Sequence, residues 1–109
     1  MEALKKLAKV LDQNADINIM VEGHTDDQPM KGAGEIKDNW DLSVMRATSV
    51  TKILLNGTNI DQKRIVAAGR GEYFPLDHAK TNDARKKNRR TEIILTPKLD
   101  ELLKVLETN

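Results

Sequence analysis

The sequence predicts an α+β fold, a two-layer sandwich in which helices pack on one small mixed β-sheet. Segments with helical apolar spacing alternate with short β-branched runs, in the order helix, strand, helix, strand, helix, strand, helix. No internal repeat and no low-complexity segment is present. The 109 residues are expected to form one domain, residues 1–109, which can be stabilised by an ordinary hydrophobic core without disulfides or a structural metal.

The first part of the chain is predicted to form a helix, a strand and a long loop. The helix is expected to end near Asn14. Its apolar residues recur at i, i+3, i+4 and i+7: Leu4, Leu7, Ala8 and Leu11. Alternating apolar residues over 17–21 predict a strand that leads into the polar segment 23–27. Residues 28–38 show little periodicity, so we expect a surface loop of the kind that is more often functional than structural.

The second part of the chain continues this alternation. Asn39 is predicted as the N-cap of a second helix, and Gly57 supplies the left-handed conformation at its end. The remaining elements are delimited by glycine and proline. They are a strand over 65–68, a helical turn over 83–87, a strand over 91–96 stopped by Pro97, and a C-terminal helix with Leu99, Leu102, Leu103 and Leu106.

Charge and composition exclude several classes of protein. Lys and Arg number 18 against 17 Asp and Glu, so bulk attraction to nucleic acid or acidic lipid is not expected. The absence of cysteine excludes a thiol nucleophile and any cysteine-based zinc or iron–sulfur site. No apolar run long enough to span a membrane and no signal peptide is found, so membrane attachment is expected only through segments outside this chain.

Arg46 is the most informative anomaly in the second predicted helix. It lies one turn after Leu42 and one turn before Val50, on the apolar stripe that continues through residues 53–54. One interpretation is that Arg46 lies at the edge of the stripe and extends to water. The other is that its guanidinium and the free amides of the helix start bind a carboxylate. The spacing is compatible with both.

The polar segment 24–27 is the second candidate site. His24 and Asp26 are too few for a metal site, because zinc needs three or four ligands and the other histidine, His78, lies in a distant loop. Asp26 and Asp27 are adjacent, so they point to opposite faces, and no nucleophile is near them. We therefore expect no catalytic residues, no metal and no cofactor, and a protein that is not an enzyme.

Two other motifs are interpreted as structural. The segment 69–74, GRGEYF, lacks the third glycine of the dinucleotide fingerprint, so nucleotide binding is not predicted. Five of the six residues 85–90 are basic, which is typical of a solvated face at a helix end. Because the chain also has few aromatic residues for base stacking, nucleic acid is not an expected partner.

Four motifs follow one another over nearly the whole chain. They are VEGHTD at 21–26, NWDLSVMRA at 39–47 followed by Val50, GRGE at 69–72 followed by Pro75, and NRR at 88–90. Together they resemble the OmpA-like C-terminal domain of outer-membrane OmpA proteins, peptidoglycan-associated lipoprotein and the MotB stator protein. The resemblance implies an OmpA-like fold from which the family's first strand is missing here. An unfilled sheet edge would invite pairing with a second copy, a homodimer.

The resemblance implies non-covalent binding of cell-wall peptidoglycan through the meso-diaminopimelate of its stem peptide. The family's key aspartate corresponds to Asp26 and its key arginine to Arg46. The family's further binding positions correspond to Asn39, Thr25 and Arg89. The free end of diaminopimelate carries an ammonium and a carboxylate on one carbon, so an aspartate and a guanidinium a few ångströms apart suit it. This favours the second interpretation of Arg46.

The implied protein is a periplasmic module that attaches an outer-membrane or envelope protein to the wall through a segment outside this chain. Asp26 and Arg46 are 20 positions apart, more than in the compact family pattern, and the additional residues fall in the 28–38 loop, as in MotB-like members. The alternative is an envelope protein-interaction or MotB-like stator module in which wall binding is secondary. Its contact surfaces would be Trp40 with the long loop, and the basic residues 85–90.

Overall fold

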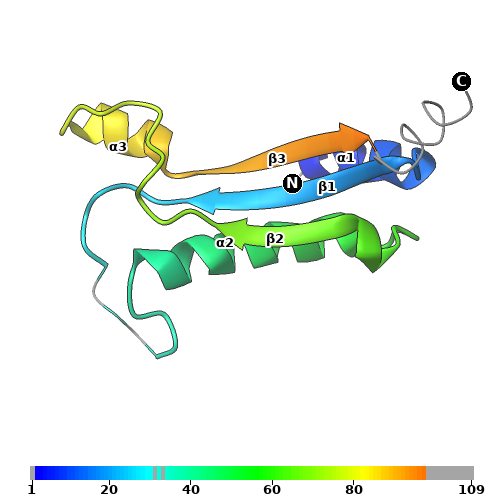
Figure 1. Ribbon diagram of the computed structural model, residues 1–109, viewed down its shortest axis with the longest axis horizontal. Helices are drawn as coiled ribbons and strands as arrows, with labels where there is room; N and C mark the ends of the chain where they lie inside the picture. The colour runs from blue at the N-terminus through cyan, green and yellow to red at the C-terminus, as the bar shows by residue number, and fades with distance from the viewer. Residues whose placement is uncertain (1, 31, 33, 98–109) are drawn as a thin grey trace, which may run out of the picture.

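The computed structural model describes residues 2–30, 32 and 34–97, and its elements follow the predicted order (Figure 1). They are α1 Glu2–Gln13, β1 Ile17–His24, α2 Asn39–Leu55, the 3-10 helix η1 Gln62–Arg64, β2 Ile65–Gly69, α3 Asn82–Asn88 and β3 Arg90–Pro97. None of these helices is both long and apolar enough to cross a membrane. The helix predicted around Leu99 to Leu106 lies outside the described residues.

The three described strands form one mixed sheet in the order β2-β1-β3, which confirms the predicted sheet type. The central strand β1 runs parallel to β2 and antiparallel to β3. In this register Val21 lies opposite Ala67 on β2 and Ile93 on β3. Within residues 2–30, 32 and 34–97, no further strand pairs with the outer edge of β3.

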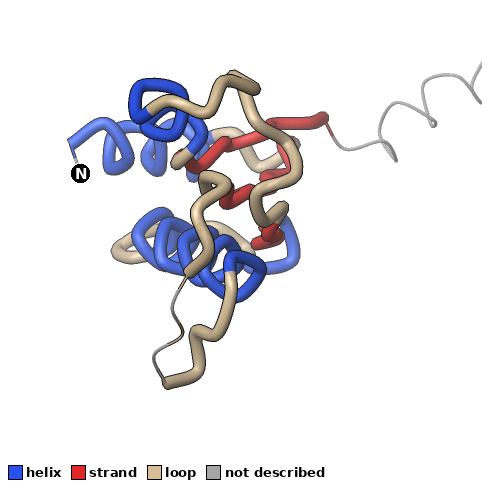
Figure 2. The backbone as a smooth tube through the Cα atoms, turned by 90° about the vertical axis from the view of Figure 1, so that its left-hand side faces the viewer, coloured by secondary structure: helices blue, strands red, loops and turns tan. Residues whose placement is uncertain are grey.

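Both long helices, α1 and α2, pack on the same face of the sheet, which confirms the two-layer sandwich (Figure 2). Alternate residues of β1 point to that face, so Ile19 and Val21 are buried while Met20 between them is exposed. The core is formed by aliphatic residues from α1, β1, α2 and the segment before η1: Ala8, Leu11, Ile19, Val21, Ala47, Leu54 and Ile60. The carboxyl ends of β1 and β2 are therefore supported by a two-layer core.

The face of α2 that packs on the sheet differs from the predicted apolar stripe. Its fully buried residues are Ser43, Ala47 and Leu54, whereas Leu42 and Arg46 are only half-buried at the edge of this face. The predicted stripe was based on large apolar residues, so it did not include Ser43 and Ala47, whose small side chains are buried. Arg46 therefore lies at the border between the core and solvent, as the first interpretation of its position required.

Two glycines explain why the buried residues of α2 are small. Gly23 on β1 and Gly69 on β2 lie directly under the helix, and a Cβ at either one would collide with Ser43. The hydroxyl of Ser43 also accepts a hydrogen bond of 3.0 Å from the backbone amide of Gly71. The first half of α2 is thus held against the ends of β1 and β2 by close backbone contact.

The predicted helix caps are half correct. Gly57 has a φ of +75°, so its predicted left-handed conformation is confirmed. The N-cap is Asp38 and not Asn39, because Asp38 has extended backbone angles and its carboxylate accepts a 2.9 Å hydrogen bond from the amide of Asp41. Asn39 is the first residue of the helix, and its side chain is used elsewhere.

Arg64 is a buried cation that the sequence analysis did not single out. It is 6% exposed, and its guanidinium donates to the carbonyl oxygens of Leu11, Asn14 and Ile17 at 3.0, 2.6 and 2.9 Å. These carbonyls lie at the end of α1 and at the start of β1. Arg64 therefore ties the end of α1 to the start of β1 through three backbone carbonyl oxygens, of which those of Leu11 and Asn14 also accept backbone amides.

Candidate functional site

The candidate site lies at the carboxyl end of β1. Figure 1 shows that four segments come together there: the loop after β1, the first turns of α2, the loop after β2, and α3 with the start of β3. The carboxyl ends of neighbouring parallel strands commonly carry binding sites, because the loops that follow them converge. All five predicted site residues belong to these segments.

Asp26 is paired with Arg89. One carboxylate oxygen of Asp26, Oδ2, accepts a 2.7 Å hydrogen bond from Nη1 of Arg89, and the other accepts from the backbone amide of Gln28 at 3.0 Å. The Asp26 side chain is 12% exposed and that of Arg89 is 44% exposed. Asp26 is therefore held firmly, while its partner is exposed enough to reorient toward a ligand.

Arg46 reaches the same strand end from α2. Its Nη1 donates to the carbonyl oxygen of His24 at 3.0 Å, two residues before Asp26. Among the described residues this is the one hydrogen bond of its guanidinium, so Nε and Nη2 stay available to a ligand. We predicted that free amides at the start of the helix bind a carboxylate together with Arg46. The amide of Asp41 is not free for this, because it donates to the carboxylate of Asp38.

Asn39 and Thr25 fix the loop that carries Asp26. The side-chain amide of Asn39 donates to the carbonyl oxygens of Asp26 and Gln28 at 3.3 and 3.0 Å. Thr25 is buried; its hydroxyl donates to the Asp26 carbonyl oxygen at 3.0 Å, and its amide donates to Gly71 at 2.9 Å. Both predicted residues thus orient the site through the backbone around Asp26.

Asp27 is held by two cations from the α3 region. Its carboxylate accepts from Nζ of Lys80 at 2.8 Å and from Nε of Arg85 at 2.9 Å. The hydrogen bond from Lys80, followed by that from Arg85, holds the pKa of Asp27 well below its usual value. This pair of contacts ties the loop after β1 to α3.

The Asp27 contacts predict a pH-dependent part of the stability. A carboxylate whose pKa is lowered by folding stabilises the folded state above its unfolded pKa of about 3.9, and this contribution is lost as the pH falls below that value. We expect wild type to melt higher than Asp27→Asn at pH 7, with the difference shrinking below about pH 4. Melting curves by circular dichroism measure it, with the exposed Asp16→Asn as control. A difference that stayed constant from pH 7 to pH 3 would contradict this account.

The basic residues 85–90 do more than form a solvated face. Arg85 and Arg89 pair with the two aspartates of the β1 loop, and Arg90 pairs with Glu92 at 2.9 Å. The interpretation as a solvated face holds only for residues 86–87, which are exposed. The run therefore supplies the cations that organise the end of β1.

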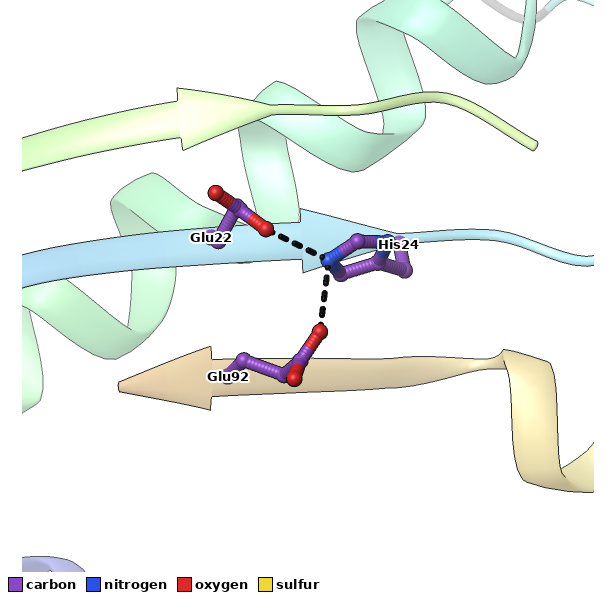
Figure 3. Close-up of side chains that lie close together, drawn as sticks. All are labelled: Glu22, His24 and Glu92. Carbon is purple, nitrogen blue, oxygen red and sulfur yellow. Dashed lines mark hydrogen bonds and ion pairs between the residues drawn. The ribbon is translucent and has the colours of Figure 1, made fainter. Parts of the chain in front are cut away.

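A cluster that the sequence analysis missed lies on the sheet face away from the helices. Figure 3 shows His24 with its Nε2 atom between the carboxylates of Glu22 and Glu92, at 3.0 Å from each. His24 is 1% exposed and the Glu22 side chain is 8% exposed, so their contact is protected from water, whereas the Glu92 side chain is 43% exposed. The i, i+2 spacing of Glu22 and His24 in a strand places them on one face and was the available signal.

The Glu22, His24 and Glu92 cluster is built as an ion-pair network. Arg70 pairs with Glu22 at 3.1 Å, and Arg90 pairs with Glu92. The three ligand atoms have the types that would suit a divalent cation. Both carboxylates are already neutralised by guanidinium groups, so a cation would have to compete with them. We interpret the cluster as a structural support beneath the site.

Comparisons with known proteins agree with this geometry. The sequence profile described as OmpA family matches residues 1–89. Motility protein B of Bacillus subtilis (strain 168) is 40% identical over 94 residues, which are 86% of this chain and 36% of that protein. Peptidoglycan-associated lipoprotein of Buchnera aphidicola subsp. Baizongia pistaciae is 34% identical over 91 residues, which are 84% of this chain and 49% of that protein.

The fold is also similar to solved structures. A MotB-like protein from Desulfovibrio vulgaris superposes with a TM-score of 0.79 and 32% identity, over 88% of this chain and 60% of that one. This similarity confirms the predicted arrangement of helices on a small mixed sheet. The chain spans only 36% and 49% of the length of the two curated relatives.

Proposed function

Because the chain belongs to the OmpA family, we propose that it binds peptidoglycan non-covalently through the meso-diaminopimelate of the stem peptide. The observation that carries this proposal is the position of Arg46, whose half-buried guanidinium is bonded to the carbonyl oxygen of His24, two residues before Asp26, and keeps donors available at the end of β1. The name of one relative, peptidoglycan-associated lipoprotein, points to the same ligand.

In the proposed complex the two charges of the ligand find opposite charges in the protein. The ammonium group of diaminopimelate pairs with Asp26, and its carboxylate receives two parallel hydrogen bonds from Arg46. Arg89, which is paired with Asp26 in the free protein and is 44% exposed, turns toward the carboxylate of the ligand. Asn39 and Thr25 keep the Asp26 backbone in place. The complex thereby exchanges one protein ion pair for pairs with the ligand.

The proposed site binds weakly as a single copy. Partly exposed charge-assisted contacts contribute about 1–3 kcal/mol each, so two of them give a low intrinsic affinity. Attachment to a wall polymer raises the effective concentration of the site, and many copies on one surface add avidity. We propose that the chain acts in the periplasm as a binding module, attached to the envelope through a further segment of its protein. Pairing of two copies along an unfilled edge of the sheet stays a prediction.

A comparison of two wall types tests the proposal. Lysine-type stem peptides lack the carboxylate that Arg46 is proposed to bind, so we expect them to bind about tenfold or more weakly than diaminopimelate-type peptides. Calorimetry with soluble stem peptides of both types measures this ratio, and pelleting with purified walls provides an independent readout. Equal affinity for the two types would contradict the proposed contact. Release of soluble wall fragments during incubation would instead indicate a hydrolase.

A second candidate function is that of a stator module in a membrane complex. It is favoured by the 40% identity to motility protein B, the highest identity among the relatives described above. In this case the main partner is a protein that contacts the surface around Trp40 and the exposed residues 86–87. Substitutions there that remove partner binding but leave wall binding intact would favour the stator role over simple anchoring.

A further inference from the structure

The chain exposes all of its phenylalanine, tyrosine and tryptophan side chains. The sequence contains one of each, Trp40, Tyr73 and Phe74, and their exposed fractions are 49%, 60% and 55%. Aromatic side chains usually contribute strongly to a core, because each buries a large apolar area. A domain that places all three near the carboxyl ends of β1 and β2, beside its candidate site, gives up this contribution. The position of Trp40 and Tyr73, which line a cavity there, therefore points to contact with a ligand.

Trp40 and Tyr73 form one continuous aromatic surface. Trp40 belongs to the first turn of α2 and Tyr73 to the loop after β2, and their ring centroids are 5.3 Å apart with planes inclined by 31°. Gly71 permits this arrangement, because a Cβ there would lie 3.3 Å from each ring. Phe74 is not part of this surface, and the guanidinium of Arg70 lies 4.7 Å from its ring centroid.

A cavity of about 290 Å³ adjoins these two rings. Its wall also includes Asp38, Asn39 and Glu72, which supply carboxylate and amide groups. Both charged residues in this set are acidic, so the cavity disfavours an anionic ligand such as a phosphate or a carboxylate. The shallow inclination of the rings makes a platform and not a box, which suits a flat ligand better than a compact cation.

We propose that this surface binds a neutral N-acetylated amino sugar of a glycan strand, stacked on Trp40 and Tyr73. The face of a pyranose ring presents C–H groups, whose partial positive charge complements the negative face of an aromatic ring. Its hydroxyl and N-acetyl groups lie around the edge, where the carboxylates of Asp38 and Glu72 and the side-chain oxygen of Asn39 can accept hydrogen bonds from them. The platform thus matches both the apolar face and the polar edge of a sugar.

The sugar site adjoins the proposed diaminopimelate site. Asn39 lines the cavity, and the same side chain donates to the carbonyl oxygen of Asp26. Stem peptides branch from glycan strands, so an intact wall offers a sugar and a stem peptide side by side. This inference rests on the proposed function and deepens it, because it assigns a second part of the same polymer to a second surface of the chain.

Trp40 is the only tryptophan, so its fluorescence reports directly on the platform. The probe is chitotetraose, a neutral tetramer of N-acetylglucosamine without any peptide. We expect a saturable change in emission for wild type, and about fivefold weaker binding for Tyr73→Ala. Phe74→Ala is the matched control, because Phe74 is equally exposed but does not line the cavity, and it should bind as wild type does. Circular dichroism verifies that both variants fold.

Three results would overturn the sugar proposal. They are no saturable change with wild type, equal affinity of wild type and Tyr73→Ala, and saturation of the Trp40 signal by tetramethylammonium with no response to chitotetraose. A parallel titration with a peptide that contains diaminopimelate separates this inference from the proposed function. Chitotetraose has no stem peptide, so its binding does not depend on Asp26 and Arg46, and each titration succeeds or fails independently.

Discussion

Replacing Arg46 by alanine is expected to abolish pelleting of the chain with diaminopimelate-type peptidoglycan while leaving the fold intact. The substitution removes the guanidinium proposed to bind the ligand carboxylate. A charge-assisted contact of this kind contributes about 1.5–3 kcal/mol, equivalent to about 10- to 100-fold in affinity. Since the single site is already weak, such a loss removes detectable binding. The fold should survive, because Arg46 is only half-buried and donates to one carbonyl oxygen, that of His24.

Two further variants make the Arg46 result specific. Lys52→Ala removes the same unit of charge from an exposed position on α2, so it should pellet with the wall as wild type does. Arg46→Lys keeps the charge but loses the planar fork, so we expect it to recover only a minor part of the binding. Melting curves provide the structural readout. A large fall in the melting temperature of Arg46→Ala would show that this residue supports the fold, and undiminished pelleting would contradict its proposed role.

Local patterns in the sequence were sufficient to predict the order of the elements. Most described helices and strands lie close to their predicted positions, because apolar spacing and delimiting glycines and prolines act over short segments. However, β1 extends three residues beyond its predicted end, and the 3-10 helix η1 was not predicted. The N-cap was predicted one residue late. Asp38 and Asn39 are both good caps, and the choice between them depends on the hydrogen bonds from Asn39 to the loop after β1. That loop is distant in the sequence, so no local pattern contains this information.

The sequence predicted which residues lie at the site better than it predicted which residues they contact. The five candidate residues do lie at the end of β1, but the ion pair of Asp26 with Arg89 joins positions 63 residues apart. Nothing in the spacing of the basic run distinguishes Arg89, which pairs with this loop, from Lys87, which is exposed. Tertiary packing makes that distinction. The edge position of Arg46 likewise follows from which side of α2 meets the sheet, and two glycines on neighbouring strands determine that side.

The largest expected loss of stability comes from Gly23→Ala. The new Cβ would lie 2.0 Å from the carbonyl oxygen of Ser43 and 3.2 Å from the amide nitrogen of Ala47. Both are backbone atoms of α2, so no side-chain rotation relieves the collision, and the helix must move away from β1. Overpacking of this kind costs about 3 kcal/mol or more, which corresponds to a fall of about 15 °C in the melting temperature of a domain this size.

Gly57→Ala is the matched control for Gly23→Ala. Gly57 has a φ of +75° with no atom near the position of a Cβ, so alanine there should cost only about 1 kcal/mol of backbone strain. Melting curves of both variants compare the effect of a steric collision with that of backbone strain. Equal falls in melting temperature would contradict the proposal that the close approach of β1 and α2 requires glycine at position 23. The same geometry also predicts an effect of Gly23→Ala on wall binding. Displacing α2 also displaces Arg46, so any Gly23→Ala molecules that stay folded at low temperature should bind the wall more weakly than wild type, whereas folded Gly57→Ala should bind it normally.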